Sequence, residues 1–206
     1  MSVMLDLIGS MVVASFVILF GLRLNQSIAG SRDASMANLN VQQSLADVVR
    51  SVEYDFRKIG FDTPDPSRSL AIADSGHIKF YANMQRRYGP GGAPLLDSVE
   101  WFTAPAPVSS AGHPVKTLYR KFDEDEPVGS AGMGITQFAI TYFDQDGQAV
   151  APGVPSLYGK IAVIEVTLNV ESLYKVQDAV NGDTTAYAAA YWRQTRMTSR
   201  NLRRHG

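Results

Sequence analysis

The sequence predicts an α+β protein in which one long N-terminal helix packs against an antiparallel sheet. An uncharged apolar run lies near the start of the chain, and apolar residues then recur at steps of three and four up to Ile59, with no proline before Pro64. The remainder consists of short runs of alternating apolar and polar residues, separated by loops rich in proline and glycine. Helical periodicity followed by strand periodicity is typical of an α+β domain.

The first segment, residues 1–25, is predicted to span a membrane. The run from Leu7 to Leu22 contains no charged residue, and Asp6 and Arg23 bracket it. A membrane-spanning helix needs about 20 mostly apolar residues, which this run approaches when its flanks are counted. A cleaved secretory signal and an ordinary buried core helix are the alternatives. Because no basic region precedes the apolar run, we interpret it as a membrane helix and not as a signal peptide.

Residues 26–60 are predicted to continue the same helix as an amphipathic segment. Its apolar stripe is formed by Val41, Leu45, Val48, Val52, Phe56 and Ile59. Gly60 followed by Pro64 indicates a helix stop, because glycine adopts the left-handed conformation that ends many helices. The pair Gly30-Ser31 is where we expect any bend to occur. A helix from Leu5 to Ile59 would be about 80 Å long, at about 1.5 Å per residue.

Residues 61–206 are predicted to form a β-rich head. The expected strands are His77–Ala82, Ser98–Thr103, Val115–Lys121, Ile135–Phe143, Lys160–Val170 and a last strand from roughly Ala186 to Thr198. In the longest of these, Ile164, Val166, Leu168 and Val170 alternate with polar residues, which is typical of a strand with one buried face. We expect this apolar face to cover the helix stripe at Val48, Val52 and Phe56, since each set is apolar on one side only.

Composition excludes several classes of function. The chain has 206 residues, with 19 basic and 20 acidic side chains, so it lacks the basic excess of a general nucleic-acid binder. It contains no cysteine, which rules out thiol catalysis, disulfides and thiolate metal sites. The three histidines, His77, His113 and His205, have no metal-ligand spacing. No catalytic arrangement stands out, and we predict neither an enzyme nor a bound cofactor.

Three motifs that resemble ligand sites are better interpreted as loops. The glycine-rich run Gly129–Gly134 lacks the lysine and hydroxyl of a phosphate-binding loop. The sequence Phe143–Gln148 (FDQDGQ) has its glycine too early for a calcium loop and predicts a turn between strands. The acidic run Asp123–Glu126 is a better cation attractor, but four adjacent side chains do not all converge on one ion. We expect a solvated loop there, with calcium binding as the alternative.

The C-terminal region is rich in arginine. Arg193, Arg196, Arg200, Arg203 and Arg204 occur among the last residues, without an acidic one between them. Cationic side chains on an edge strand block unwanted pairing between sheets, and this is the interpretation we favour. Binding to an acidic neighbour or to anionic lipid headgroups is the alternative.

The combination of these segments resembles the type IV pilin and type II secretion pseudopilin superfamily. The carrying features are the apolar helix that continues as an amphipathic one, and segments of the head that match loose family patterns. These segments are Lys116–Asp123 (KTLYRKFD), Ile135–Gly147 (ITQFAITYFDQDG), Tyr158–Ser172 (YGKIAVIEVTLNVES) and Tyr191–Arg204 (YWRQTRMTSRNLRR). They are similar to the "L-x-R", "Y-x-D-x-x-G", "V-x-V-x-L" and "R-N-L" patterns, and the nearest members are the W-type minor pilins and J-type minor pseudopilins.

The resemblance implies a structural subunit of a type IV pilus or a type II secretion pseudopilus, with other pilin-like subunits and inner-membrane lipid as its partners. It implies single-pass anchoring with the head outside the cytoplasm. The subunit would assemble through its helix, at Asp6, Leu7, Val12, Phe16 and Phe20. Family members carry glutamate at the fifth mature position, and Asp6 falls there if only Met1 is removed.

Two other functions stay open at this stage. The chain could be a single-pass accessory subunit of another cell-envelope complex, with the sheet as its binding module. A membrane-tethered enzyme is the third hypothesis, and it would depend on the carboxylates between residues 123 and 146.

Overall fold

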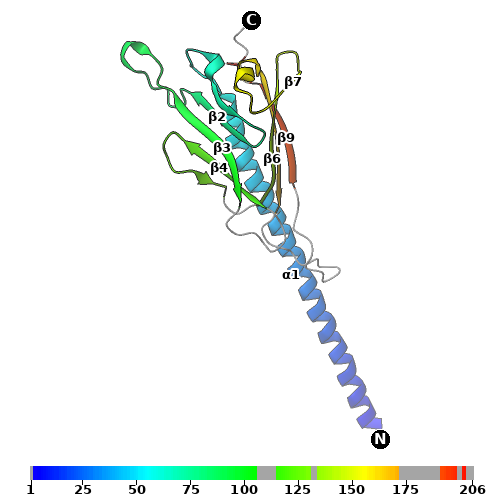
Figure 1. The fold of residues 1–206 in the computed structure, drawn as a ribbon. Coiled ribbons are helices and arrows are strands. Elements are labelled where there is room, and N and C mark those ends of the chain that lie inside the picture. Colours follow the sequence, from blue (N-terminus) through cyan, green and yellow to red (C-terminus); the bar gives the residue numbers. More distant parts are fainter. Residues whose placement is uncertain (1, 106–114, 131–133, 172–190, 199–200, 203–206) are drawn as a thin grey trace.

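The computed structural model describes residues 2–105, 115–130, 134–171, 191–198 and 201–202. Helix α1 spans Ser2–Arg57 without interruption, so the predicted continuous helix is confirmed, including its passage through Gly30-Ser31. Figure 1 shows its N-terminal half projecting from the head, while its C-terminal part lies along the sheet. The molecule therefore has a bare helical stalk and a head built around the other end of the same helix.

The described strands of the head form one antiparallel sheet. Its strands are β1 (Leu70–Ala73), β2 (His77–Ala82), β3 (Asp97–Pro105), β4 (Lys116–Phe122), β5 (Val128–Gly129), β6 (Gly134–Phe143), β7 (Ala149–Val150), β8 (Val163–Glu171) and β9 (Tyr191–Thr198). Their order is β1-β2-β3-β4-β6-β8-β9, with β5 paired to β4 and β7 paired to β6. Short 3₁₀ helices lie in the described loops at Pro66–Arg68, Pro90–Gly92 and Pro155–Lys160.

The six predicted strands are present, with small shifts at their ends. The strand predicted from Lys160 begins at Val163, because Pro155–Lys160 forms a 3₁₀ helix. The start predicted at Ala186 lies outside the described residues. Strands β1, β5 and β7 were not predicted; each is only two to four residues long. Such short strands are defined by their pairing partners and carry little pattern of their own.

The sheet opens between β4 and β6. These strands share one register pair, Lys116 with Ile135, whereas β6 and β8 pair from Gly134–Glu171 to Phe143–Val163. Figure 1 accordingly shows β2, β3 and β4 on one side of α1, and β6 and β9 on the other. This opening allows two groups of strands to contact one helix.

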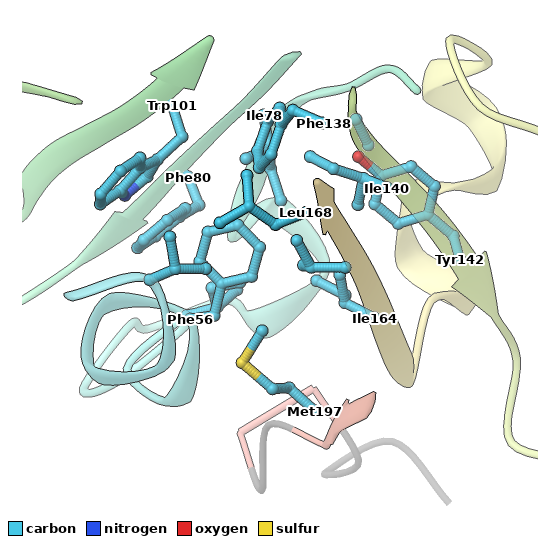
Figure 2. Close-up of a cluster of buried hydrophobic side chains, with 14 of the residues drawn as sticks. Phe56, Ile78, Phe80, Trp101, Phe138, Ile140, Tyr142, Ile164, Leu168 and Met197 are labelled. Carbon is cyan, nitrogen blue, oxygen red and sulfur yellow. The ribbon is translucent and has the colours of Figure 1, made fainter. Parts of the chain in front are cut away.

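The core lies between α1 and the sheet face turned toward it. The buried apolar residues of α1 are Val41, Leu45, Val49, Val52 and Phe56, and Ile59 just after the helix is buried as well. Figure 2 shows Phe56 beside Phe80 of β2; their rings meet edge to face, with centroids 6.0 Å apart. A small cavity between α1 and the sheet is bordered by Val52, Val166 and Leu168, so the expected contact between helix and β8 is present.

One position of the helix stripe differs from the sequence interpretation. Val49 is 8% exposed and lies in the core, whereas Val48 packs against the core but stays partly exposed. Both residues are three or four positions from Leu45, so either satisfies helical periodicity. The direction in which the sheet lies around the helix makes Val49 the buried one.

The end of α1 depends on Gly60. This residue has a φ of +70°, and a Cβ at its position would lie 2.6 Å from Ser69 Oγ. Its backbone N–H donates to the carbonyl of Tyr81 in β2 (3.1 Å), while the N–H of Phe61 donates to the carbonyl of Lys58 (2.8 Å). Both the left-handed conformation and the close approach of Ser69 require glycine.

Candidate assembly site

The projecting part of α1 is apolar and uncovered. Every side chain that the structure describes between Val3 and Ala29 is exposed, including Phe16 at 67% and Phe20 at 65%. This helix is long and apolar enough to cross a membrane, and none of its most apolar stretch is buried by the head. Because burying one large apolar side chain is worth about 1.5–3 kcal/mol, exposing this surface to water is unfavourable.

The polar side chains within this apolar stretch suit a medium without water. The hydroxyl of Ser10 donates to the carbonyl of Leu7 (2.9 Å), and that of Ser15 donates to the carbonyl of Met11 (2.8 Å). Both hydroxyl donors are therefore satisfied within the helix itself. In hydrocarbon an unsatisfied donor costs several kcal/mol, so these bonds remove a barrier to burial of the helix.

One face of this helix forms a shallow groove. It is lined by Ile8, Met11, Val12, Ser15, Phe16 and Leu19. Of the candidate assembly residues, Val12 and Phe16 lie in this groove, whereas Asp6, Leu7 and Phe20 are exposed but do not line it. The structure thus brings two of the five residues together and distributes the others over the rest of the helix surface.

A buried carboxylate attaches the other end of α1 to the sheet. Asp55 is 1% exposed; it accepts hydrogen bonds from Trp101 Nε1 in β3 (2.9 Å) and from Nε (2.6 Å) and Nη2 (3.0 Å) of Arg120 in β4. The hydrogen bond to Asp55 raises the pKa of Arg120 above its usual value, so the guanidinium stays charged. A bidentate, charge-assisted arrangement of this kind sets both distance and orientation.

The sequence interpretation missed the Asp55–Arg120 pair. A signal for it was present, because Asp55 lies three residues after Val52 and next to Phe56, on the apolar side of a helix. A carboxylate at such a position requires a partner, since burying an unpaired charge is strongly unfavourable. Arg120 is the arginine of the "L-x-R" pattern, but only the fold places it 65 residues away from its partner in the chain and in direct contact.

Two further contacts hold the helix to the last part of the chain. Arg193 Nη2 in β9 lies 3.6 Å from Glu53 Oε1, and Asn201 Nδ2 donates to the carbonyl of Ile59 (3.3 Å). Leu202 is buried. Strand β9 is an edge strand, as expected, and Arg196 lies over the ring of Phe143. Arg200, Arg203 and Arg204 lie outside the described residues.

The candidate calcium loops have structural roles in the described part of the chain. Asp123 accepts a hydrogen bond from the N–H of Ser98 (2.5 Å), and Asp144 accepts from the N–H groups of Asp146 (3.0 Å) and Gln148 (2.8 Å). The Asp144 bonds form the predicted turn between β6 and β7, with Gly147 at a φ of +77°. Among the described residues no group of three or more potential ligands is gathered as for a metal ion.

A bare apolar N-terminal helix that continues into a head of antiparallel strands defines a pilin-like α+β fold. The structure is similar to that of the type IV-like pilin TTHA1219 from Thermus thermophilus, with a TM-score of 0.50 and 8% sequence identity. The similarity covers 79% of this chain and 98% of that one. No protein-family model and no curated protein sequence matches the chain.

Proposed function

We propose that this protein is a minor structural subunit of an envelope-spanning filament, a type IV pilus or a type II secretion pseudopilus, and that it assembles through its N-terminal helix. The observation that carries the proposal is the uncovered apolar part of α1, which continues into a head of pilin-like fold. The head buries the amphipathic end of the helix and leaves the other end for partners.

The same apolar surface has two environments in this proposal. Before assembly, residues 1–25 anchor the subunit in the inner membrane, with the head outside the cytoplasm. During assembly, the helix exchanges lipid for the helices of neighbouring subunits, and Leu7, Val12, Phe16 and Phe20 pack against them. Lipid tails are as apolar as the side chains of neighbouring helices, so the exchange has no hydrophobic driving force. It depends on close packing and on polar pairing between the helices.

Asp6 supplies the polar pairing. It is exposed at the start of an otherwise apolar surface, where a carboxylate is expensive unless it finds a cation. The N-terminal amine of a neighbouring subunit is such a cation. In a helix bundle without water, a shift in register would leave the two charges buried and unpaired, which is strongly unfavourable. The ion pair therefore specifies the register of the helices more than it adds stability.

Cysteine cross-linking in membranes tests this proposal. The chain has no native cysteine, so the full-length variants Val12→Cys and Phe16→Cys each report on one position. We expect each of these cysteines, which line the groove of α1, to form a cross-link with a pilin-like partner that carries a cysteine at the corresponding position along its own N-terminal helix. Ser67→Cys, exposed in the head on the Pro66–Arg68 turn, is the control for random collision.

The role of Asp6 is tested in the same assay. Asp6→Asn should abolish the cross-links, whereas Asp6→Glu should retain them, because only a carboxylate pairs with an amine. If the protein stays in the membrane fraction but Val12→Cys cross-links to no pilin-like partner, the filament proposal is wrong. That outcome would favour an accessory subunit of another envelope complex.

A further inference from the structure

A positively charged groove lies beside α1 in the head. It has a volume of about 330 Å³ and is lined by Arg50, Ser51, Tyr54, Asp55 and Arg120. Asp55 supplies the one lining carboxylate, which is 1% exposed and already bonded by Trp101 and Arg120. Arg120 uses Nε and Nη2 for that carboxylate, and its Nη1 bonds no residue that the structure describes. The groove thus offers guanidinium donors to solvent, while its negative charge is already satisfied.

The helix side of this groove adds a second cation and an aromatic surface. Arg50 is 81% exposed, and its ion-pair contact within the described part of the chain is a long one of 3.6 Å with Asp47. The ring of Tyr54 is also largely exposed, and Lys58 holds it: Lys58 Nζ donates to Tyr54 Oη (2.6 Å) and lies 4.2 Å from the ring centroid. A ligand of the groove should therefore carry carboxylates next to an apolar group.

The same head carries a segment with this chemistry. Glu124, Asp125 and Glu126 form the exposed turn between β4 and β5, and Val128 beyond them is 72% exposed. The turn is closed by a hydrogen bond from the N–H of Asp125 to the carbonyl of Phe122 (2.9 Å). In the described part of the chain none of the three carboxylates has an ion-pair partner. Figure 1 shows the hairpin, beside the β4 label, projecting from the flank of the head away from α1.

We propose that the acidic turn Glu124–Glu126 of one copy docks in the groove formed by Arg50, Tyr54 and Arg120 on a second copy. The carboxylates meet Arg50 and the free Nη1 of Arg120, and Val128 covers the ring of Tyr54. The groove and the turn are neighbouring surfaces of one head, because Arg120 in β4 and Val128 in β5 are register partners. The contact joins the groove of one copy to the acidic turn of another. This inference rests on the proposed filament function, for which it supplies a contact between heads.

Mixed cysteine cross-linking tests the contact in membranes. Two full-length copies with different tags are expressed together, one carrying Ser51→Cys in the groove and the other Pro127→Cys beside the acidic turn. We expect a disulfide-linked heterodimer. The control pair replaces Ser51→Cys with Ser67→Cys, which is also exposed but lies outside the groove.

A charge exchange then tests the chemistry. Arg50→Glu in the groove copy should lower the yield of the heterodimer about tenfold, since close charge pairs across interfaces are strongly coupled. Glu124→Arg with Asp125→Arg in the other copy should restore it. Arg68→Glu is the matched control, because Arg68 is 88% exposed in the same head and does not line the groove.

The outcomes separate this inference from the function on which it rests. If cross-links through Val12→Cys form but the groove heterodimer does not, the head contact is wrong and the filament proposal stands. If both are absent, the filament proposal fails as well. If Arg50→Glu lowers the yield and the exchanged charges do not restore it, the groove binds something other than the acidic turn, and the inference is overturned.

Discussion

Asp55 in α1, a buried carboxylate, and Arg120 in β4 form a bidentate ion pair, with Nε–Oδ2 and Nη2–Oδ1 distances of 2.6 and 3.0 Å. Trp101 adds a third hydrogen bond to the same carboxylate. The pair joins the helix to strands β3 and β4, on the side of the sheet away from β8 and β9. Because the sheet opens between β4 and β6, packing against β8 alone does not hold these strands. Apolar contacts such as Phe56 with Phe80 and this ion pair together hold them on α1.

The Arg120→Ala variant should therefore be strongly destabilised. It leaves the carboxylate of Asp55 buried without a cation, which costs about 3–5 kcal/mol for a fully buried pair. We expect about 3 kcal/mol, since the side chain of Arg120 is 35% exposed and water partly replaces it. Chemical denaturation of the full-length protein in detergent measures the difference. Arg120→Lys should recover little, because an ammonium does not reproduce the two parallel bonds. A loss below about 1 kcal/mol would contradict the proposed fixing role.

Phe56→Ala tests the packing of helix on sheet. Phe56 is 1% exposed and meets Phe80 edge to face, so its truncation should cost about 3–5 kcal/mol. For a domain of this size, that corresponds to a fall in the melting temperature of at least about 6 °C. Thermal unfolding followed by circular dichroism of a fragment that begins at Gln26 measures it. Arg57→Ala, on the exposed side of the same turn, should change the melting temperature little; equal effects would show that the helix does not pack there.

Neighbouring valines provide an internal comparison. Val49 lies in the core, and Val48 is partly exposed at its margin. Val49→Ala should cost about 1.5–3 kcal/mol, because each buried methylene contributes about 0.8 kcal/mol and a cavity adds to the loss. Val48→Ala should cost about half as much. Both variants remove the same two methyl groups from a valine. The difference between their denaturation midpoints therefore reports which side of the helix faces the sheet.

Tyr142 should make the head sensitive to alkali. Its hydroxyl donates to the carbonyl of Asp74 (2.8 Å), and burial, followed by the charge of Asp74, raises its pKa well above the ordinary value of 10.0. Because the pKa of Tyr142 is higher in the folded state, the unfolded chain releases this proton first as the pH rises. The contribution of Tyr142 to the free energy of unfolding is therefore complete below pH 10 and is lost as the pH rises further.

Tyr142→Phe should consequently lower the free energy of unfolding by about 1 kcal/mol at pH 7, because the hydrogen bond is missing. Above pH 10 the stability of this variant should fall less steeply than that of the parent protein. Melting temperatures measured from pH 8 to about pH 11 give both quantities. Tyr54→Phe, which removes an exposed hydroxyl, is the control for the loss of one tyrosine. Parallel curves for Tyr142→Phe and the parent protein would contradict the assignment.

Periodicity was sufficient to predict the elements that carry a long pattern. Helix α1 was predicted to within a few residues at each end, because its apolar steps continue without proline up to a glycine that takes a positive φ. Strand β8 was predicted from its alternation, and Ile164, Val166 and Leu168 are buried as expected. Both patterns follow from the regular geometry of a single helix or strand, in which side chains point to the same face at fixed intervals along the chain.

The sequence by itself determined which segments are helix and strand, that one end of α1 is apolar all round, and that Phe56 and Val52 face inward. Only the tertiary structure decided that Val49 is buried in place of Val48, that Asp55 and Arg120 pair, and that the sheet opens between β4 and β6. The physical reason is that periodicity depends only on residues close together in the chain. These three features depend instead on where strands distant in the sequence lie around the helix.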